Sequence, residues 1–281
     1  MLTSEERQLV YDRGCVPEHL PEYVQSVSDA EPFIHEGYLC FFGGGHLIFV
    51  GYPLDEAAPT PRNGYESTLN RFRPRTVAVI SANTWLSKER LQNLAEDQYF
   101  RLDLPLDIVD PRVGYMVRRA EREVLVSDGS FGTEHERIVQ SFLERKECSS
   151  WHEEIFSRIP RYLSRSPTAR LLEARRESLL TAFSVLDLGS RNYGFYMFNF
   201  RSSEIAVPGA SDLLLREMAR VAWSEGKKSL NLGLGISPGV RRFKEKWGAV
   251  PFLAYTSVLV RTRSVGLLSL LAERWGSGLV S

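Results

Sequence analysis

Basic side chains gather in one short stretch near the C-terminal end of the chain, where they could serve chemistry that develops negative charge. Residues 239–248 include Arg241, Arg242, Lys244 and Lys246. A lysine held among other cations can stabilise an oxyanion that forms in a transition state. Lys244 is the candidate for that role, and a solvated lysine on a helix surface is the alternative interpretation.

The aromatic residues of the same stretch indicate how it folds. Phe243 and Trp247 are four positions apart, so on a helix they share one face. We predict a short helix over Val240–Trp247, ended by Gly248, with both aromatic side chains toward the core. Phe243 is also a candidate for contact with a bound substrate or donor.

A second candidate site is the start of a predicted helix at Gly209, Ala210 and Ser211. Backbone N–H groups at a helix start can bind an anion. Asn231 comes at the end of a short predicted strand and is a candidate to line the same cleft.

The elements that would position these residues form a mixed pattern. Three β-rich runs predict an antiparallel meander, and a helix with an apolar stripe follows it. A glycine triplet at 43–45 between two apolar runs predicts a hairpin. The predicted strands are 38–42, 46–50, 76–80, 99–104, 114–117, 169–174, 179–188, 193–200, 229–232 and 252–261; the predicted helices are 87–96, 134–147, 210–225 and 265–275; residues 51–74 are predicted as loop.

Composition fits an ordinary globular protein. The chain has 281 residues, of which 43% are hydrophobic, and 35 basic residues balance 35 acidic ones. Three cysteines and five histidines have neither disulfide nor metal-ligand spacing, so we expect no metal site. No apolar run approaches the roughly 18 residues of a spanning helix, and no signal peptide is recognisable. We expect a cytoplasmic protein.

Two groups of arginines interrupt this neutral background. One lies between Arg158 and Arg176, and the other between Arg112 and Arg122. Such groups could bind the phosphates of a nucleic acid or of coenzyme A. Acidic residues lie near both groups, so ion-paired surfaces are the alternative.

Three motifs carry a resemblance to a known family. They are Val207-Pro-Gly-Ala-Ser-Asp, Lys228-Ser-Leu-Asn-Leu-Gly and Gly239-Val-Arg-Arg-Phe-Lys-Glu-Lys-Trp-Gly. Their order and spacing resemble the second lobe of Fem-type aminoacyltransferases, of related GNAT N-acyltransferases and of the soluble domain of phosphatidylglycerol lysyltransferases. Over the first half only the segment around Arg118 and Arg119 is similar.

The resemblance implies an α/β (α+β) fold of two GNAT-like lobes, each a mixed, mostly antiparallel sheet flanked by helices. We expect the lobes at residues 1–150 and 151–281, with the first one diverged. It also implies an N-acyltransferase that moves an acyl or aminoacyl group to an amine of a small molecule or peptide. Lys244 then supports the transfer step.

The donor implied by the resemblance is either aminoacyl-tRNA or acyl-CoA, used as a co-substrate and not as a tightly bound cofactor. The loop that would hold the coenzyme A pyrophosphate reads Glu204-Ile-Ala-Val-Pro-Gly-Ala-Ser, an incomplete glycine pattern with an upstream acid, which favours aminoacyl-tRNA. Arg118, Arg119, Arg241 and Arg242 are the candidates for binding donor or substrate charge.

The nearest candidates for a general base are Glu204 and Tyr196. Two alternative functions stay open. One is a coenzyme A-dependent acetyltransferase with a diverged pyrophosphate loop. The other is an inactive GNAT fold that only binds.

Overall fold

The computed structural model describes residues 1–86, 92–107, 110–145 and 150–262. One sheet of eleven strands runs through these residues in the order β1-β2-β3-β4-β11-β5-β10-β9-β8-β7-β6. Neighbouring strands are antiparallel except for the parallel pairs β3–β4 and β9–β10. The strands are β1 Glu31–His35, β2 Tyr38–Gly43, β3 His46–Val50, β4 Thr76–Ser81, β5 Gln92–Asp103, β6 Leu125–Asp128, β7 Ala169–Arg176, β8 Leu179–Asp187, β9 Tyr193–Arg201, β10 Ser229–Leu234 and β11 Val250–Arg261.

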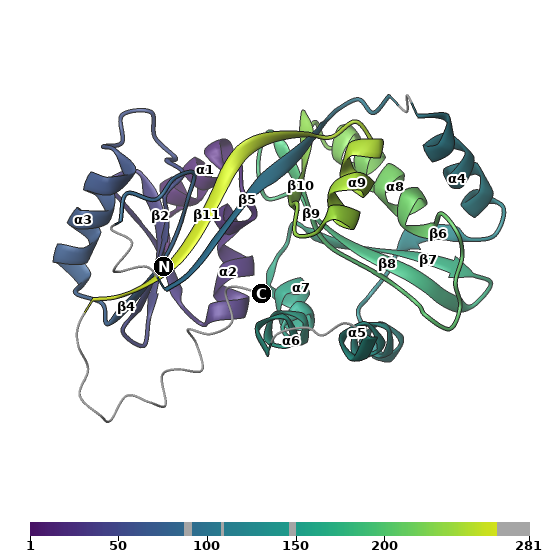
Figure 1. Ribbon diagram of the computed structural model, residues 1–281, viewed down its shortest axis with the longest axis horizontal. Coiled ribbons are helices and arrows are strands. Elements are labelled where there is room, and N and C mark those ends of the chain that lie inside the picture. Colours follow the sequence, from purple (N-terminus) through teal and green to yellow (C-terminus); the bar gives the residue numbers. More distant parts are fainter. Residues whose placement is uncertain (87–91, 108–109, 146–149, 263–281) are drawn as a thin grey trace.

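Helices cover both faces of this sheet (Figure 1). At one end of the sheet, α3 packs on one face of β1–β4, and α1 and α2 pack on the other. At the other end, α4, α8 and α9 share one face, and α5, α6 and α7 share the opposite one. The helices are α1 Ser4–Arg13, the short 3-10 helix η1 Pro17–His19, α2 Pro21–Ser28, α3 Pro61–Phe72, α4 Pro111–Glu121, α5 Thr133–Arg145, α6 Ser150–Ser157, α7 Ile159–Arg165, α8 Ala210–Ser224 and α9 Pro238–Lys246.

Two long strands join the ends of the sheet. β5 and β11 lie side by side and cross from one end to the other (Figure 1). β11, the last described strand, inserts between β4 and β5, whereas α4, β6 and α5 pack with the strands that follow them. Elements from before and after residue 150 are therefore neighbours in one sheet. The division into lobes at that residue stays a prediction.

The mixed α/β fold class is confirmed, and so are the elements with strong local signals. The hairpin β2–β3, the meander β7–β8–β9 and helix α8 lie where the sequence predicts them. The apolar stripe predicted for α8 consists of Leu214, Met218, Val221 and Ala222, and all four are buried. The predicted helix 265–275 lies outside the described residues.

Three predictions about the first half are wrong. Residues 114–117 belong to helix α4, which Asp110 caps and Pro111 begins; its buried residues Val113, Val117 and Ala120 have helical spacing. Residues 92–96 of the predicted helix 87–96 are strand β5, because pairing with β11 overrides local helix preference. The predicted loop 51–74 contains helix α3.

Candidate active site at the β10 bulge

The candidate site begins where strand β10 leaves its regular pairing. β10 pairs with β9 only over Ser229–Asn231, and its register with β5 shifts between Asn231 and Leu234. β9 continues along β8 to Arg201, so the two parallel strands separate beyond Asn231. Gly233 has a φ of +74°, which a residue with a side chain rarely adopts, and it permits the bulge.

Asn231 holds the bulge in place. Its side-chain oxygen accepts a hydrogen bond from the Gly233 backbone at 2.8 Å, and its amide donates to the Cys15 carbonyl at 2.9 Å. The side chain is fully buried. The structure therefore gives Asn231 a positioning role, and contact with a substrate stays a prediction.

Lys244 points from helix α9 toward this bulge. Its Nζ donates a hydrogen bond to the Leu234 carbonyl and lies 5.6 Å from the centre of the Phe100 ring. The residue is only 3% exposed. Burial lowers the pKa of the Lys244 ammonium to about 7, against the opposing attraction of the Asp97 carboxylate. At neutral pH this amine can therefore hold or release a proton.

Asp97 is a member of the site that the sequence prediction missed. It lies on β5, between the predicted helix 87–96 and the predicted strand 99–104, and its carboxylate accepts hydrogen bonds from the Ile236 backbone at 2.7 Å and from Arg241 at 2.9 Å. These bonds tie the loop before α9 to β5. Asp97 thus fixes Arg241 beside Lys244.

The C-terminal end of α9 is fastened to the start of α8. The buried carboxylate of Asp212 accepts a hydrogen bond from Trp247 at 2.9 Å and pairs with Lys246 at 2.6 Å. The Lys246 ammonium also lies 4.8 Å from the centre of the Phe243 ring. Phe243 and Trp247 pack in the core below α8, as predicted.

Packing occupies the predicted anion site at the start of α8. Gly209 has a φ of +86°, and a Cβ there would lie 2.3 Å from the Met116 carbonyl of α4. Ala210 is buried, and Ser211 donates a hydrogen bond to Asn199. Asp212 already places a carboxylate in the first turn. Donor binding by residues 209–211 stays a prediction.

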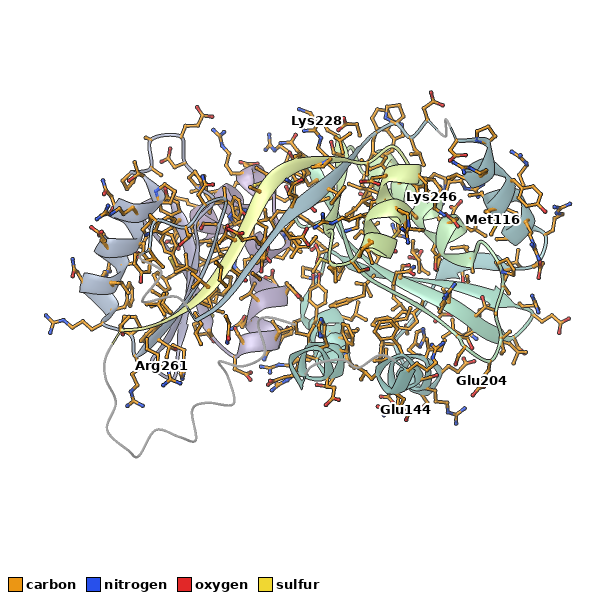
Figure 2. The ribbon with its side chains drawn as sticks, viewed as in Figure 1. Met116, Glu144, Glu204, Lys228, Lys246 and Arg261 are labelled. Atoms are coloured by element: carbon orange, nitrogen blue, oxygen red, sulfur yellow. The ribbon has the colours of Figure 1, made fainter. Side chains whose placement is uncertain are left out.

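The two candidate bases lie in different surroundings, and the identity of the general base stays a prediction. Glu204 is exposed on the loop after β9, and Figure 2 shows it well away from Lys246 of α9. Tyr196 is half-buried, and burial together with the Asp212 carboxylate raises the pKa of its phenol. A phenol with a raised pKa stays protonated at neutral pH, so it is a poor base.

The arginines divide into paired and free ones. Between Arg158 and Arg176, five of them pair with acidic residues; these are Arg158, Arg161, Arg170, Arg175 and Arg176. On α4, Arg119 lies 3.8 Å from Glu123. Arg118 and Arg242 are exposed, and neither has an ion pair with any residue that the structure describes. These two remain available to a charged ligand.

Comparisons with known proteins agree with this geometry at the level of the fold. No protein-family model and no curated protein matches the sequence. Among solved structures, FemX is 10% identical, with 91% of this chain and 96% of that chain covered and a TM-score of 0.61. L-PGS from Bacillus licheniformis is 16% identical, with coverage of 98% and 97% and a TM-score of 0.60.

A GCN5-related N-acetyltransferase from Kribbella flavida is 11% identical, with 89% of this chain and 95% of that chain covered and a TM-score of 0.50. The resemblance that the sequence motifs indicated is thus confirmed. The chain has the fold of the Fem-type and GNAT acyltransferases. Among the described residues, no helix is both long and apolar enough to cross a membrane.

Proposed function

We propose that this protein is an N-acyltransferase that moves an aminoacyl group from aminoacyl-tRNA to an amine of a small molecule or peptide. The observation that carries the proposal is the buried Lys244, whose ammonium lies at the β10 bulge with a pKa lowered to about 7. A donor of this kind places the reaction in the cytoplasm.

The chemistry needs one cation at the reacting carbonyl. The acceptor amine attacks the ester carbon, a C–N bond forms, and the carbonyl oxygen becomes an oxyanion. The Lys244 ammonium stabilises that oxyanion. The intermediate then collapses, the C–O bond to the ribose breaks, and the proton that the amine loses goes to the leaving oxygen. A lysine with a pKa near 7 is suited to relay that proton.

The start of α8 supports tRNA over coenzyme A as the donor. The Asp212 carboxylate is buried in the first turn of α8, and α9 is fastened across it. A pyrophosphate there would meet that negative charge at close range. Exposed Arg118 and Arg242 offer unpaired charge to a tRNA backbone.

The test of the reaction is transfer from radiolabelled aminoacyl-tRNA to a panel of amines. Lys244→Ala should lower the rate at least about 100-fold, as loss of one oxyanion donor does elsewhere. Lys228→Ala is the matched control, because Lys228 is an exposed lysine (Figure 2). Full turnover by the Lys244 variant would refute the assigned role.

The test of the donor is thermal stability with each candidate added separately, since a ligand of the native state raises the melting temperature. A rise with charged tRNA that weakens in Arg118→Glu and Arg242→Glu supports the proposal. A rise with acyl-CoA alone would make the protein a coenzyme A-dependent acetyltransferase. No rise with any donor would favour a fold that only binds.

A further inference from the structure

A group of tyrosines surrounds one carboxyl group on the face of β5 that points away from Lys244. Neighbouring residues of a strand face opposite sides of the sheet. Phe100 lies below Lys244, so the preceding Tyr99 faces the core under α1 and α2 instead. Figure 1 shows α1 and α2 beside the region where β5 and β11 cross.

Glu18 of η1 lies at the centre of this group. Its Oε2 accepts a hydrogen bond from the Tyr99 hydroxyl at 2.7 Å. The Tyr99 ring lies edge-on to the Tyr255 ring, with 5.5 Å between centroids, and to the Tyr52 ring at 6.0 Å. Tyr255 belongs to the same buried cluster as Tyr99, and Tyr23 packs against that cluster. Burial and the charge of Glu18 raise the pKa of both phenols.

Among the residues that the structure describes, no cation balances Glu18. Burial raises the pKa of its carboxyl, and only hydrogen bonds from Tyr99 and its own backbone oppose that shift. Within the described part of the chain, no basic side chain pairs with it. Its ionisable neighbours are neutral, because burial raises the pKa of Cys15 to about 12 and lowers that of His19 to about 4.

Asp187 shows what a purely structural buried carboxylate looks like in this protein. It accepts hydrogen bonds from Tyr162, Ser166, Thr168 and the Gly189 backbone. Such a set satisfies a buried carboxylate without a cation. Among the described residues Glu18 has one side-chain donor, Tyr99, so its ionised form is far less well compensated.

We propose that Glu18, Tyr23, Tyr99 and Tyr255 form a binding site for a primary ammonium group, the amine of the acceptor substrate. A carboxylate among aromatic rings is the chemistry that recognises an alkylammonium ion. Glu18 and Tyr23 are half-buried and keep some surface for a ligand, whereas Tyr99 and Tyr255 are buried and form the floor.

The position of this ammonium site relative to Lys244 suits its role, which rests on the proposed acyl transfer. Tyr99 pairs with Leu234 across β5 and β10, and the Leu234 carbonyl holds the Lys244 ammonium. For attack, the bound ammonium must first pass one proton to the Glu18 carboxylate, and the free amine must then meet the carbonyl held at Lys244 at the β10 bulge, where β9 and β10 separate.

The test follows the ring resonances of ¹³C-labelled tyrosine by NMR while n-butylammonium chloride is added without any acyl donor. We expect saturable shifts for Tyr23, Tyr99 and Tyr255, and a dissociation constant at least tenfold higher in Glu18→Gln. Gln keeps an acceptor for the Tyr99 hydroxyl. Glu31→Gln is the control, because Glu31 is exposed at the start of β1; it should bind like the wild type.

Neutral n-butanol separates recognition of charge from filling of an apolar crevice. Equal shifts with butanol, no saturable shifts with butylammonium, or equal affinity in Glu18→Gln would each overturn the proposal. A second variant, Tyr23→Leu, leaves the Glu18–Tyr99 hydrogen bond in place and removes one aromatic wall. Tyr23→Leu should weaken butylammonium binding severalfold. The proposal can then be tested even if Glu18→Gln does not fold.

The ammonium site and the proposed acyl transfer can fail separately. If butylammonium binds through Glu18 but no donor supports transfer, the ammonium site stands and the acyltransferase proposal fails. If transfer depends on Lys244 while Glu18→Gln leaves the KM for the amine unchanged, the acyltransferase proposal stands and the ammonium site fails.

Discussion

Replacing Lys244 by Met should change how the free energy of unfolding depends on pH. In the folded protein burial lowers the pKa of this ammonium from its ordinary 10.5 to about 7. Above pH 7 the folded chain therefore releases a proton that the unfolded chain still holds. Stability then rises with pH, because the unfolded state binds more protons. This rise is absent when residue 244 cannot be protonated.

The magnitude follows from the two pKa values. Between about pH 7 and pH 9 the folded wild type should gain roughly 2 kcal/mol relative to Lys244→Met. The Leu234 carbonyl loses its donor in the variant, but that offset is the same at both pH values. Urea unfolding curves at the two pH values, followed by fluorescence, measure the difference.

The exposed Lys228→Met is the matched control, and its curves should shift with pH as the wild type does. Parallel pH dependence of the wild type and Lys244→Met would refute the reasoning, because it would mean that Lys244 keeps an ordinary pKa in the folded protein. The proton relay proposed above would then lose its basis. A loss of stability in Lys244→Met that is the same at every pH would not bear on the prediction. Only the change in the free energy of unfolding between the two pH values tests whether burial lowers the pKa of Lys244.

Three further predictions concern stability. Gly209→Ala should lower the free energy of unfolding by more than about 2 kcal/mol, because the left-handed backbone and the close approach of α4 both oppose a Cβ. Gly132→Ala, at a position with open space around it, is the control in denaturant unfolding. Burial lowers the pKa of His19 to about 4, so between pH 6.5 and pH 5 His19 becomes protonated in the unfolded chain but stays neutral in the folded one. Wild-type stability should fall there by roughly 1.5 kcal/mol more than that of His19→Gln, measured by urea unfolding. Asp212→Ala should lower the free energy of unfolding by roughly 3 kcal/mol, because Trp247 and Lys246 lose their buried acceptor. The denaturant midpoint and tryptophan fluorescence measure this loss.

Local signals predicted the elements on which the site depends. The apolar stripe of α8, the aromatic pair of α9 and the β-rich runs of the meander each lie within a short window of sequence. Their predicted ranges agree with the structure to within a few residues. The three motifs that carry the family resemblance also lie in this part of the chain.

Long-range pairing explains what the sequence could not predict. β5 begins within a predicted helix and is stabilised by β10 and β11, which come more than a hundred residues later. Asp97 lies between the predicted helix and the predicted strand, and its partners Ile236 and Arg241 are distant in sequence, so local patterns could not identify it. Lys244 was predicted as a candidate, but nothing in a stretch rich in basic residues showed that it alone would be buried. Glu18 lies between two prolines in a segment without periodicity, and only the fold brings tyrosines around it.

Asn231 connects the two halves of the proposed mechanism. Its oxygen holds Gly233 in the bulge beside Lys244, and its nitrogen holds the Cys15 carbonyl, three residues before Glu18. One fully buried amide thus sets the position of both the bulge and the segment that carries the carboxyl. Attack requires the amine nitrogen and the carbonyl carbon to come within about 3.5 Å, so the bulge and the segment that carries Glu18 must hold a fixed relative position, because small misplacements of reacting groups are costly. A short amide bridge between two backbone segments is a rigid means of keeping it.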